Sequence, residues 1–261
     1  MTLLRHELRQ SRRALAVWTG TIGFFVAICV FMFPEMKDEM EGVTELFASM
    51  GAFSAAFGMD RLSFGTLMGF YSVECGNILG LGGAFFAAFT AANALAKEEK
   101  DRTAEFLLTH PVSRARVTTE KLLAVMAQIV ILNAVVFGLS VASVAMIGET
   151  VSWKELGLLH LAHFLLQVQM AGICFGISAF LRQSGAGIGL GLGAAMYFMN
   201  IVANISDRAA FLKYVTPFGY TEGADIITNG ALDTPLVLLG MVFTAAGIAA
   251  AYWQYGRKDI H

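Results

Sequence analysis

Apolar positions in this chain gather into six long runs, and most polar positions fall in the short segments between them. A helix that crosses about 30 Å of hydrocarbon needs about 20 mainly apolar residues, and each run has that length. The pattern predicts spans at 14–33, 76–96, 122–147, 156–181, 185–205 and 236–255. We therefore expect an all-α, polytopic membrane protein whose single transmembrane domain covers residues 1–261.

The composition agrees with this fold class. Charged residues make up 15% of the chain and the mean hydropathy is +0.63, whereas soluble domains carry about 25% charged residues. The net charge of −2, with no basic stripe away from the spans, argues against a nucleic-acid partner. Cys29, Cys75 and Cys174 lie in or beside apolar runs without metal-ligand spacing, so we interpret them as packing residues.

The basic residues predict how the chain is oriented. An even number of spans puts both ends on one side, and thirteen of the 18 Lys and Arg residues fall there. By the positive-inside rule, both termini and the segment 97–121 are then cytoplasmic. The first apolar run is longer than a signal-peptide core and lacks a nearby cleavage site, so it is expected to remain as the first span.

The segments flanking the spans carry weaker patterns. Leu3, Leu4 and Leu8 share one side of residues 1–13 among arginines, which predicts an interfacial elbow helix; a disordered basic tail is the alternative. Apolar residues spaced by three and four over 34–60 predict an amphipathic outer helix that lies on the membrane or caps the bundle. Residues 206–234 are expected to form two short helices that dip back into the membrane.

The segment 97–121 is unusually charged for this chain, since it holds six of the 18 Lys and Arg residues. A short helix with Phe106, Leu107 and Leu108 is expected to end before Pro111, because proline disfavours helical geometry in the preceding residue. Exposed Phe-Leu-Leu needs a cover, which favours a docking surface over an ordinary positive-inside loop.

A new helix is predicted to begin after Ser113, which can cap it, and to continue to Ile147 without a proline. Arg114 and Arg116 fall on its first turn, where basic residues oppose the helix dipole. We therefore expect these arginines to serve a partner or lipid headgroups rather than helix stability.

No catalytic motif is visible in the chain: it has no phosphate-binding loop, no His-Glu-x-x-His and no Gly-x-Ser-x-Gly. His160 and His163 share a helix face, but without a neighbouring carboxylate they fit packing better than a metal site. The spans lack buried charged residues suited to a proton or sodium relay, which disfavours an ion-coupled carrier.

Neutral polar residues and glycines are the remaining candidates within the spans. Each polar side chain could line a pathway or make an interhelical hydrogen bond, and the structural role is favoured. They are Asn77, Asn93, Asn133, Gln167, Gln169, Asn200 and Asn204. Gly185, Gly189 and Gly193 recur every four residues, as do Gly187 and Gly191, which predicts close helix contacts within the chain or between chains.

The charged segment resembles the first cytoplasmic loop of ABC-2 type permeases. The similarity is carried by Glu99, Asp101, Thr103, Glu105, Leu107, Leu108, the run 111–114 and Lys121. The six-span layout, the basic N-terminal segment and residues 216–220 before the last span extend it over nearly the whole chain. Arg102 departs from the pattern, since many members have glycine before the threonine.

This resemblance implies a partnership. Such permeases pair with a second permease subunit, identical or different, and with two ATP-binding cassette subunits that bind ATP and Mg, so this chain would carry no cofactor. The loop would be the coupling helix, with residues 103–109 inserted into the ATPase. The implied contact residues are Arg102, Thr103, Glu105, Phe106, Leu107, Leu108, Pro111 and Arg114.

The resemblance also implies a function and a location. Relatives mostly export drugs, antimicrobial peptides, lipids or similar amphiphiles across a bacterial or archaeal cytoplasmic membrane. The alternative is a membrane scaffold that transports nothing and recruits a cytosolic partner through the same loop.

Overall fold

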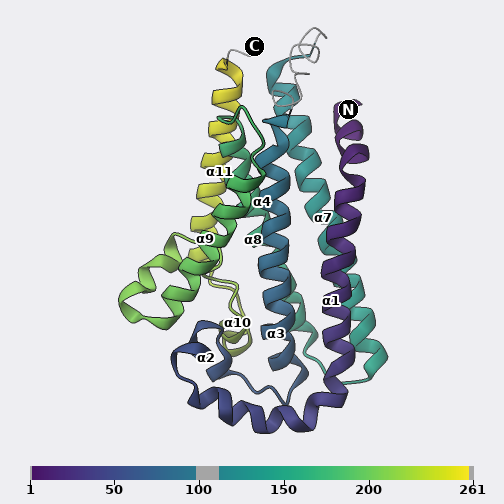
Figure 1. The fold of residues 1–261 in the computed structure, drawn as a ribbon, viewed down its shortest axis with the longest axis vertical. Coiled ribbons are helices and arrows are strands. Elements are labelled where there is room, and N and C mark those ends of the chain that lie inside the picture. The colour runs from purple at the N-terminus through teal and green to yellow at the C-terminus, as the bar shows by residue number, and fades with distance from the viewer. Residues whose placement is uncertain (1, 98–111, 259–261) are drawn as a thin grey trace.

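The computed structural model describes residues 2–97 and 112–258, and over these ranges the chain forms helices and no strands. Six of the helices are long and apolar enough to cross a membrane. Figure 1 shows them as an elongated bundle with both termini at one end, which we call the terminal end; the opposite end is the far end. The six predicted spans are thus confirmed as helices.

The first helix, α1 (Thr2–Ser49), is also the longest. Its apolar part, Leu3–Lys37, runs the length of the bundle, and the helix then turns across the far end (Figure 1). Pro34 lies inside it, where the missing N–H removes one helical hydrogen bond and favours a bend. The predicted amphipathic outer helix at 34–60 is thus the continuation of α1 up to Ser49, which caps the bundle, and the rest of that range forms separate short helices.

The structure corrects the expected elbow at 1–13. Residues 2–13 continue the first span without a break, so they are not a separate helix at an angle to it. Neither glycine nor proline occurs before Gly20, so nothing in the backbone interrupts the helix there. Contacts with a neighbouring span, described below, hold this part in line.

The second span begins nine residues before its predicted start at 76. It consists of α3 (Leu67–Asn77), the π-helical turn η2 (Ile78–Gly82) and α4 (Gly83–Ala94). Thr66 sets the start, because its side-chain oxygen accepts a hydrogen bond from the backbone N–H of Gly69 at 3.2 Å. Two short helices at the far end, α2 (Ala52–Ala56) and η1 (Met59–Arg61), connect α1 to this span.

The remaining spans agree closely with the predicted positions. They are α7 (Arg114–Ile147), α8 (Trp153–Ser178), α9 (Ala186–Ile205) and α11 (Thr234–Arg257). Ser113 caps α7 as predicted, since its side chain accepts from the N–H of Arg116. Gly148 ends α7 in the left-handed conformation, with φ 71°, which glycine adopts without strain.

Two short helices lie between α9 and α11, which confirms that part of the expectation for residues 206–234; that they dip into the membrane stays a prediction. They are η3 (Asp207–Tyr214) and α10 (Gly223–Asn229). The residues between them pass into the bundle, where Phe218 and Tyr220 are buried and the Thr216 hydroxyl donates to the carbonyl of Met196 at 2.9 Å.

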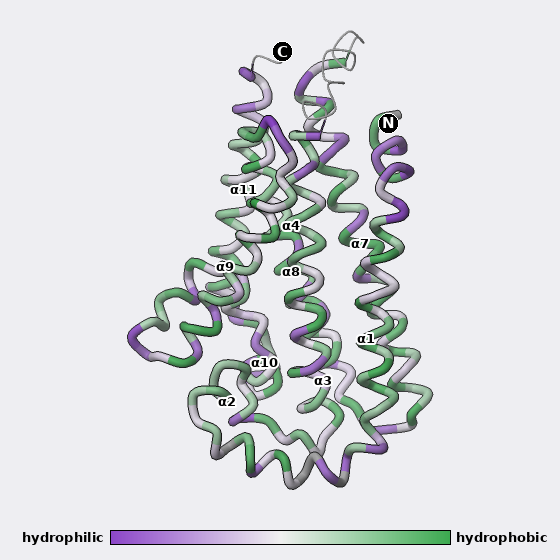
Figure 2. Tube along the Cα trace, in the orientation of Figure 1, coloured by the Kyte–Doolittle hydropathy of each residue, from purple (hydrophilic) through white to green (hydrophobic). Residues whose placement is uncertain are grey.

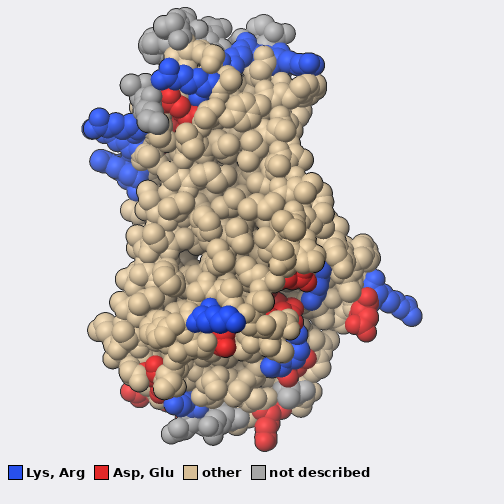
Figure 3. Space-filling model, turned by 180° about the vertical axis from the view of Figure 1, so that it is seen from behind, with Lys and Arg blue, Asp and Glu red and all other residues tan. Residues whose placement is uncertain are grey.

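The α8 helix and the α3–α4 span form the centre of the bundle. Of the most apolar 18-residue stretch of each span, 67% is buried in α8 and 61% in α3–α4. The corresponding share is 22% in both α9 and α11, which lie at the periphery. Hydrophobic residues follow the spans from end to end, and hydrophilic ones collect near both ends (Figure 2). Seen from behind, a belt without charged residues separates two charged ends (Figure 3), as expected for a bundle surrounded by lipid.

Candidate functional site

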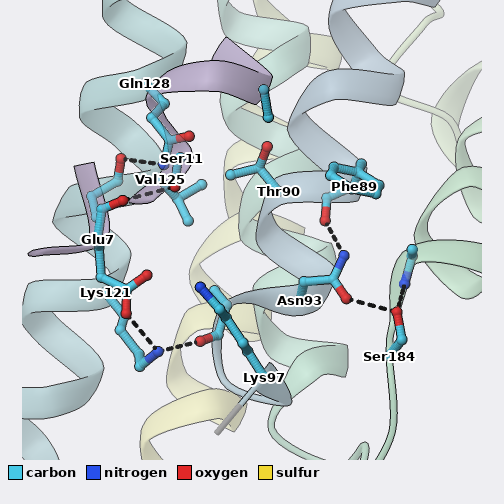
Figure 4. Close-up of a pocket in the computed structure, with 14 residues that line it drawn as sticks. Glu7, Ser11, Phe89, Thr90, Asn93, Lys97, Lys121, Val125, Gln128 and Ser184 are labelled. Atoms are coloured by element: carbon cyan, nitrogen blue, oxygen red, sulfur yellow. Dashed lines mark hydrogen bonds and ion pairs between the residues drawn. The ribbon is translucent and has the colours of Figure 1, made fainter. Parts of the chain in front are cut away.

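The terminal end is held together by a buried lysine. Lys121 of α7 donates to the carbonyl of Ala94 at the end of α4, at 2.7 Å, and to Glu7 Oε1 of α1, at 3.2 Å. Only 1% of its side chain is exposed. A buried ammonium is tolerated where it is paired and hydrogen-bonded, as it is here (Figure 4). Lys121 therefore joins three spans at the point where segment 97–121 meets the bundle.

A second contact fixes the start of α1 on α7. The backbone N–H of Leu4 donates to Glu120 Oε2 at 3.0 Å, which satisfies one of the free N–H groups at the helix start. Glu120 also accepts from Arg116 Nε at 2.9 Å, one helical turn earlier. These contacts explain why residues 2–13 stay in line with the first span.

Arg114 has a partner inside the chain. Its guanidinium donates to the carbonyl of Tyr255 at 3.3 Å and to that of Lys258, both at the end of α11. A cation suits a helix C-terminus, where backbone carbonyls lack helical partners. Lys258 in turn donates through Nζ to the carbonyl of Leu181, at 2.7 Å. The start of α7 is thus tied to α11 and to the segment after α8.

A cavity of about 470 Å³ lies beside the Lys121 contacts (Figure 4). It is enclosed by α1, α4, α7 and the start of α9, and its lining mixes charged, neutral polar and apolar side chains. The lining residues are Glu7, Ser11, Ala14, Phe89, Thr90, Asn93, Ala94, Lys97, Lys121, Ala124, Val125, Gln128, Ser184 and Ala186.

The far end holds a smaller cavity, of about 50 Å³, between α3, α9 and the residues around α10. Tyr197 donates through its hydroxyl to Asn77 Oδ1 at 3.0 Å, and Asn204 donates to the carbonyl of Ala56 at 3.3 Å. The side-chain carbonyl oxygens of Asn200 and Asn204 are buried and find no partner in the described part of the chain. His163 and Glu222 also line this cavity.

An ionic cluster closes the far end beside this cavity. Arg61 binds Glu222 and also Asp225, the latter at 2.5 Å, while Lys213 lies 3.8 Å from the second Glu222 oxygen. Glu222 is 6% exposed, and burial raises its pKa although Arg61 and Lys213 act in the opposite direction. The cluster connects η1, η3 and α10, none of which crosses the bundle.

A family model described as ABC-2 family transporter protein matches residues 1–260. The chain belongs to the ABC-2 transporter family. It is therefore a multi-pass membrane permease subunit, and the ATP-hydrolysing cassette belongs to separate subunits with which such permeases associate. A search of functionally characterised proteins gave no match.

Most of the predicted coupling residues of the permease fall outside the described residues. These are Arg102, Thr103, Glu105, Phe106, Leu107, Leu108 and Pro111, and their contacts with an ATPase stay predictions. Arg114 lies within the described residues, and its bonds tie the start of α7 to the end of α11. The dipole of α7, on which the sequence argument relied, gave no indication of this structural role.

The polar residues of the permease spans fall into two groups. Gln167 and Gln169 join helices, since Gln167 accepts from Asn133 at 2.7 Å and Gln169 donates to the carbonyl of Val237 at 3.1 Å. The other group lines cavities. Asn93 lines the terminal-end cavity, although it also accepts hydrogen bonds from Ser184 and from the N–H of Gly185, both at 3.1 Å. Asn77, Asn200 and Asn204 line the far-end cavity. Passage of cargo along any of these polar residues stays a prediction.

The glycines of α9 divide into an occupied and an open face. A Cβ at Gly189 would lie 2.7 Å from the carbonyl oxygen of Ala88, and one at Gly185 closer still to that of Ala92. A Cβ at Gly193 would lie 3.1 Å from Phe85. These three glycines therefore let α9 pack on α4. A Cβ added at Gly187 or Gly191 would meet no atom of another part of the chain within 4 Å, so these two glycines form the open face.

The two histidines of α8 take part in packing. His160 Nε2 lies 2.8 Å from the hydroxyl of Tyr71, which also donates to Ser140 at 2.8 Å. His163 Nδ1 lies 2.7 Å from the carbonyl of Leu159. Over residues 2–97 and 112–258, no group of three or more His, Cys, Asp or Glu side chains could hold a metal ion.

Proposed function

We propose that this permease is the membrane subunit of an ATP-driven exporter in a bacterial or archaeal cytoplasmic membrane. Two ATPase subunits dock on segment 97–121, a second permease completes the pathway, and the complex moves a drug, an antimicrobial peptide, a lipid or a similar amphiphile outward. Family membership supports the ATPase partnership. The excess of Lys and Arg at the terminal end supports a cytoplasmic location for that end.

The observation that carries the mechanism is the position of Lys121. It binds the end of α4, just before segment 97–121, and it belongs to α7, which begins just after that segment. A force applied to the segment therefore reaches α4 and α7 together, and Glu7 passes it to α1. Arg114 extends the same connection to α11. The coupling segment is thereby mechanically joined to four spans.

Several helix faces support pairing with a second permease. The α9 and α11 helices are the least buried spans, and the open face of Gly187 and Gly191 offers a smooth surface for close contact with another helix. At the far end, the small polar cavity beside the Arg61 cluster is the position at which we propose that the pathway opens outward.

Docking can be tested by co-purifying the permease with its ATPase. Phe106→Asp and Leu108→Asp introduce charge on the expected coupling helix, and we expect loss of the complex and of permease-dependent ATPase activity. Phe211→Asp is the matched control, since Phe211 is 63% exposed and lies at the far end. An intact complex in both loop variants would overturn the docking assignment.

Export direction needs a separate measurement. ATP-dependent uptake of a fluorescent amphiphile into inside-out vesicles is the expected result for an exporter, because the cytoplasmic face is then outside. A complex that forms and hydrolyses ATP, but accumulates no member of a panel of amphiphilic drugs, peptides and lipids in either vesicle orientation, would favour the scaffold.

A further inference from the structure

We propose that the terminal-end cavity binds the phosphate headgroup of an anionic lipid that resides in the permease. The site is the 470 Å³ cavity between α1, α4, α7 and the start of α9. Such a lipid is neither the transported cargo nor part of the contact with the ATPase.

The charge of the cavity favours an anion. Lys97 and Lys121 reach into it from the end of α4 and from α7, whereas Glu7 is the carboxylate that lines it (Figure 4). The carboxylate of Glu120, next in sequence to Lys121, is turned to the start of α1 and to Arg116 instead. Among the described lining residues, two ammonium groups and one carboxylate leave an excess of positive charge in a partly enclosed space.

The two lysines are placed for different tasks. Lys121 is held by Ala94 and Glu7, so its ammonium is fixed at the floor of the cavity. Lys97 is half-buried and makes no ion pair with any residue in 2–97 or 112–258. Lysine binds phosphate as a point charge. Lys97 is therefore the group that a bound phosphate would neutralise.

The remaining lining fits a headgroup joined to an apolar tail. Val125 and Ala124 are buried beside Lys121, and Phe89 adds an aromatic wall. Ser11 and Gln128 supply neutral polar atoms among them. A soluble anion would use the charges but not this apolar surface, whereas a phospholipid would use both.

The depth of the cavity matches the headgroup region. Its rims include Ala14 and Ala186, which mark the beginnings of the apolar runs of the first and fifth spans. Ala14 is exposed, while Lys121 and Gln128 on the α7 side are buried, so the cavity has an open rim and a closed floor. Lipid headgroups lie at the boundary between hydrocarbon and water. The rim of the cavity, at Ala14 and Ala186, lies at that boundary because the apolar runs begin there. Basic sites between spanning helices at that level are suited to anionic lipids.

The test uses the full chain in nanodiscs of phosphatidylcholine alone or with added phosphatidylglycerol or cardiolipin. Retained lipid is counted by native mass spectrometry, and thermal unfolding is followed in the same discs. Wild type is expected to retain anionic lipid and to unfold at a higher temperature when it is present. Lys97→Gln should weaken lipid retention about fivefold, since each lysine near anionic lipid contributes a factor of that order.

Two further variants show whether lipid retention depends on the charge of this cavity. Arg13→Gln removes one exposed charge at the same end, in a separate cavity that Arg9 and Arg12 also line, so it should weaken retention clearly less than Lys97→Gln does. Glu7→Gln removes the negative charge of the cavity and keeps an oxygen for Lys121, so it should strengthen retention. Equal losses in Lys97→Gln and Arg13→Gln would overturn the proposal, because they would show only general surface attraction. Equal protection by inorganic phosphate, in discs of phosphatidylcholine alone, would overturn the lipid assignment.

Discussion

The two ends of the bundle are joined in different ways. At the terminal end, polar contacts connect membrane-spanning helices directly: Lys121 links α7 to α1 and α4, and Arg114 links α7 to α11. At the far end, the Arg61 cluster connects short segments that do not cross the bundle. The terminal end is thus held by bonds between the spans themselves, whereas the contacts of the Arg61 cluster at the far end join local segments.

The difference extends to burial. Lys121 is 1% exposed, whereas Arg61 is 44% exposed and shares its charge between two carboxylates. Exposed ion pairs contribute little to stability, but breaking a buried pair leaves a charge without compensation. The terminal end should therefore tolerate substitution less well than the far end, and the following predictions test this ranking from the largest effect to the smallest.

The largest effect is expected for Lys121→Met. This change leaves the partly buried Glu7 carboxylate and the Ala94 carbonyl without their donor, and the loss of one member of a buried pair costs about 3–5 kcal/mol. Thermal unfolding in detergent would show a strongly lowered midpoint. Lys154→Met at the exposed start of α8 is the control and should stay near wild type. A midpoint for Lys121→Met close to that of the control would remove the distinction between the ends.

The second prediction follows the glycine face of α9 along the bundle. Overpacking a close helix contact costs about 1–3 kcal/mol. Gly185→Ala meets a backbone carbonyl most closely, Gly189→Ala meets one at 2.7 Å, and Gly193→Ala meets the movable ring of Phe85 at 3.1 Å. We expect the loss of stability to decrease in that order, away from the terminal end.

Gly187→Ala and Gly191→Ala serve as controls on the same helix, since their added atoms meet nothing in this chain. Both should fold normally in a single permease chain. A uniform loss across all five variants would indicate an effect of helix flexibility rather than a graded contact between α9 and α4.

The sequence predicts the spans better than it predicts these connections. The six apolar runs were sufficient to locate the spans, and the Ser113 cap was sufficient to locate the start of α7. The second span was placed too late because Ser72 and Glu74 lower the hydropathy of α3, although the Thr66 cap marks its start. The pattern of residues 1–13 fits either an interfacial helix or an in-line one, and contact with Glu120 decides between them.

The site was less accessible to sequence reasoning for a related reason. The partners of Lys121 are Glu7, which lies 114 positions away, and a backbone carbonyl that has no sequence signature. Arg114 likewise bonds to backbone carbonyls at the end of α11, and the side chains of those residues play no part in the contact. A charge pattern could indicate that segment 97–121 matters, but only the packing of the spans shows how it is anchored.

The third prediction concerns the far end. Arg61→Gln removes an exposed pair with Asp225 and leaves the buried Glu222 with Lys213 alone. We expect a loss of about 1–2 kcal/mol, because the exposed pair contributes little and the cost lies in the buried carboxylate. Arg208→Gln, an exposed arginine in η3, is the control. A loss as large as that of Lys121→Met would contradict the proposed ranking of the two ends.

The smallest effect should be a pH dependence at the far end. Burial raises the pKa of Glu222 above its value in the unfolded chain, so the folded state binds the proton more tightly. Its contribution is then complete at pH values below the unfolded pKa and is lost as the pH rises through the raised pKa. Relative to Glu222→Gln, wild type should be most stable in acid and should lose that advantage toward neutral pH. Unfolding midpoints of both proteins across the acidic range would measure this difference. A wild-type advantage that grew with rising pH would show that Arg61 and Lys213 outweigh burial, and the far end would then be held by its ion pairs as firmly as the terminal end.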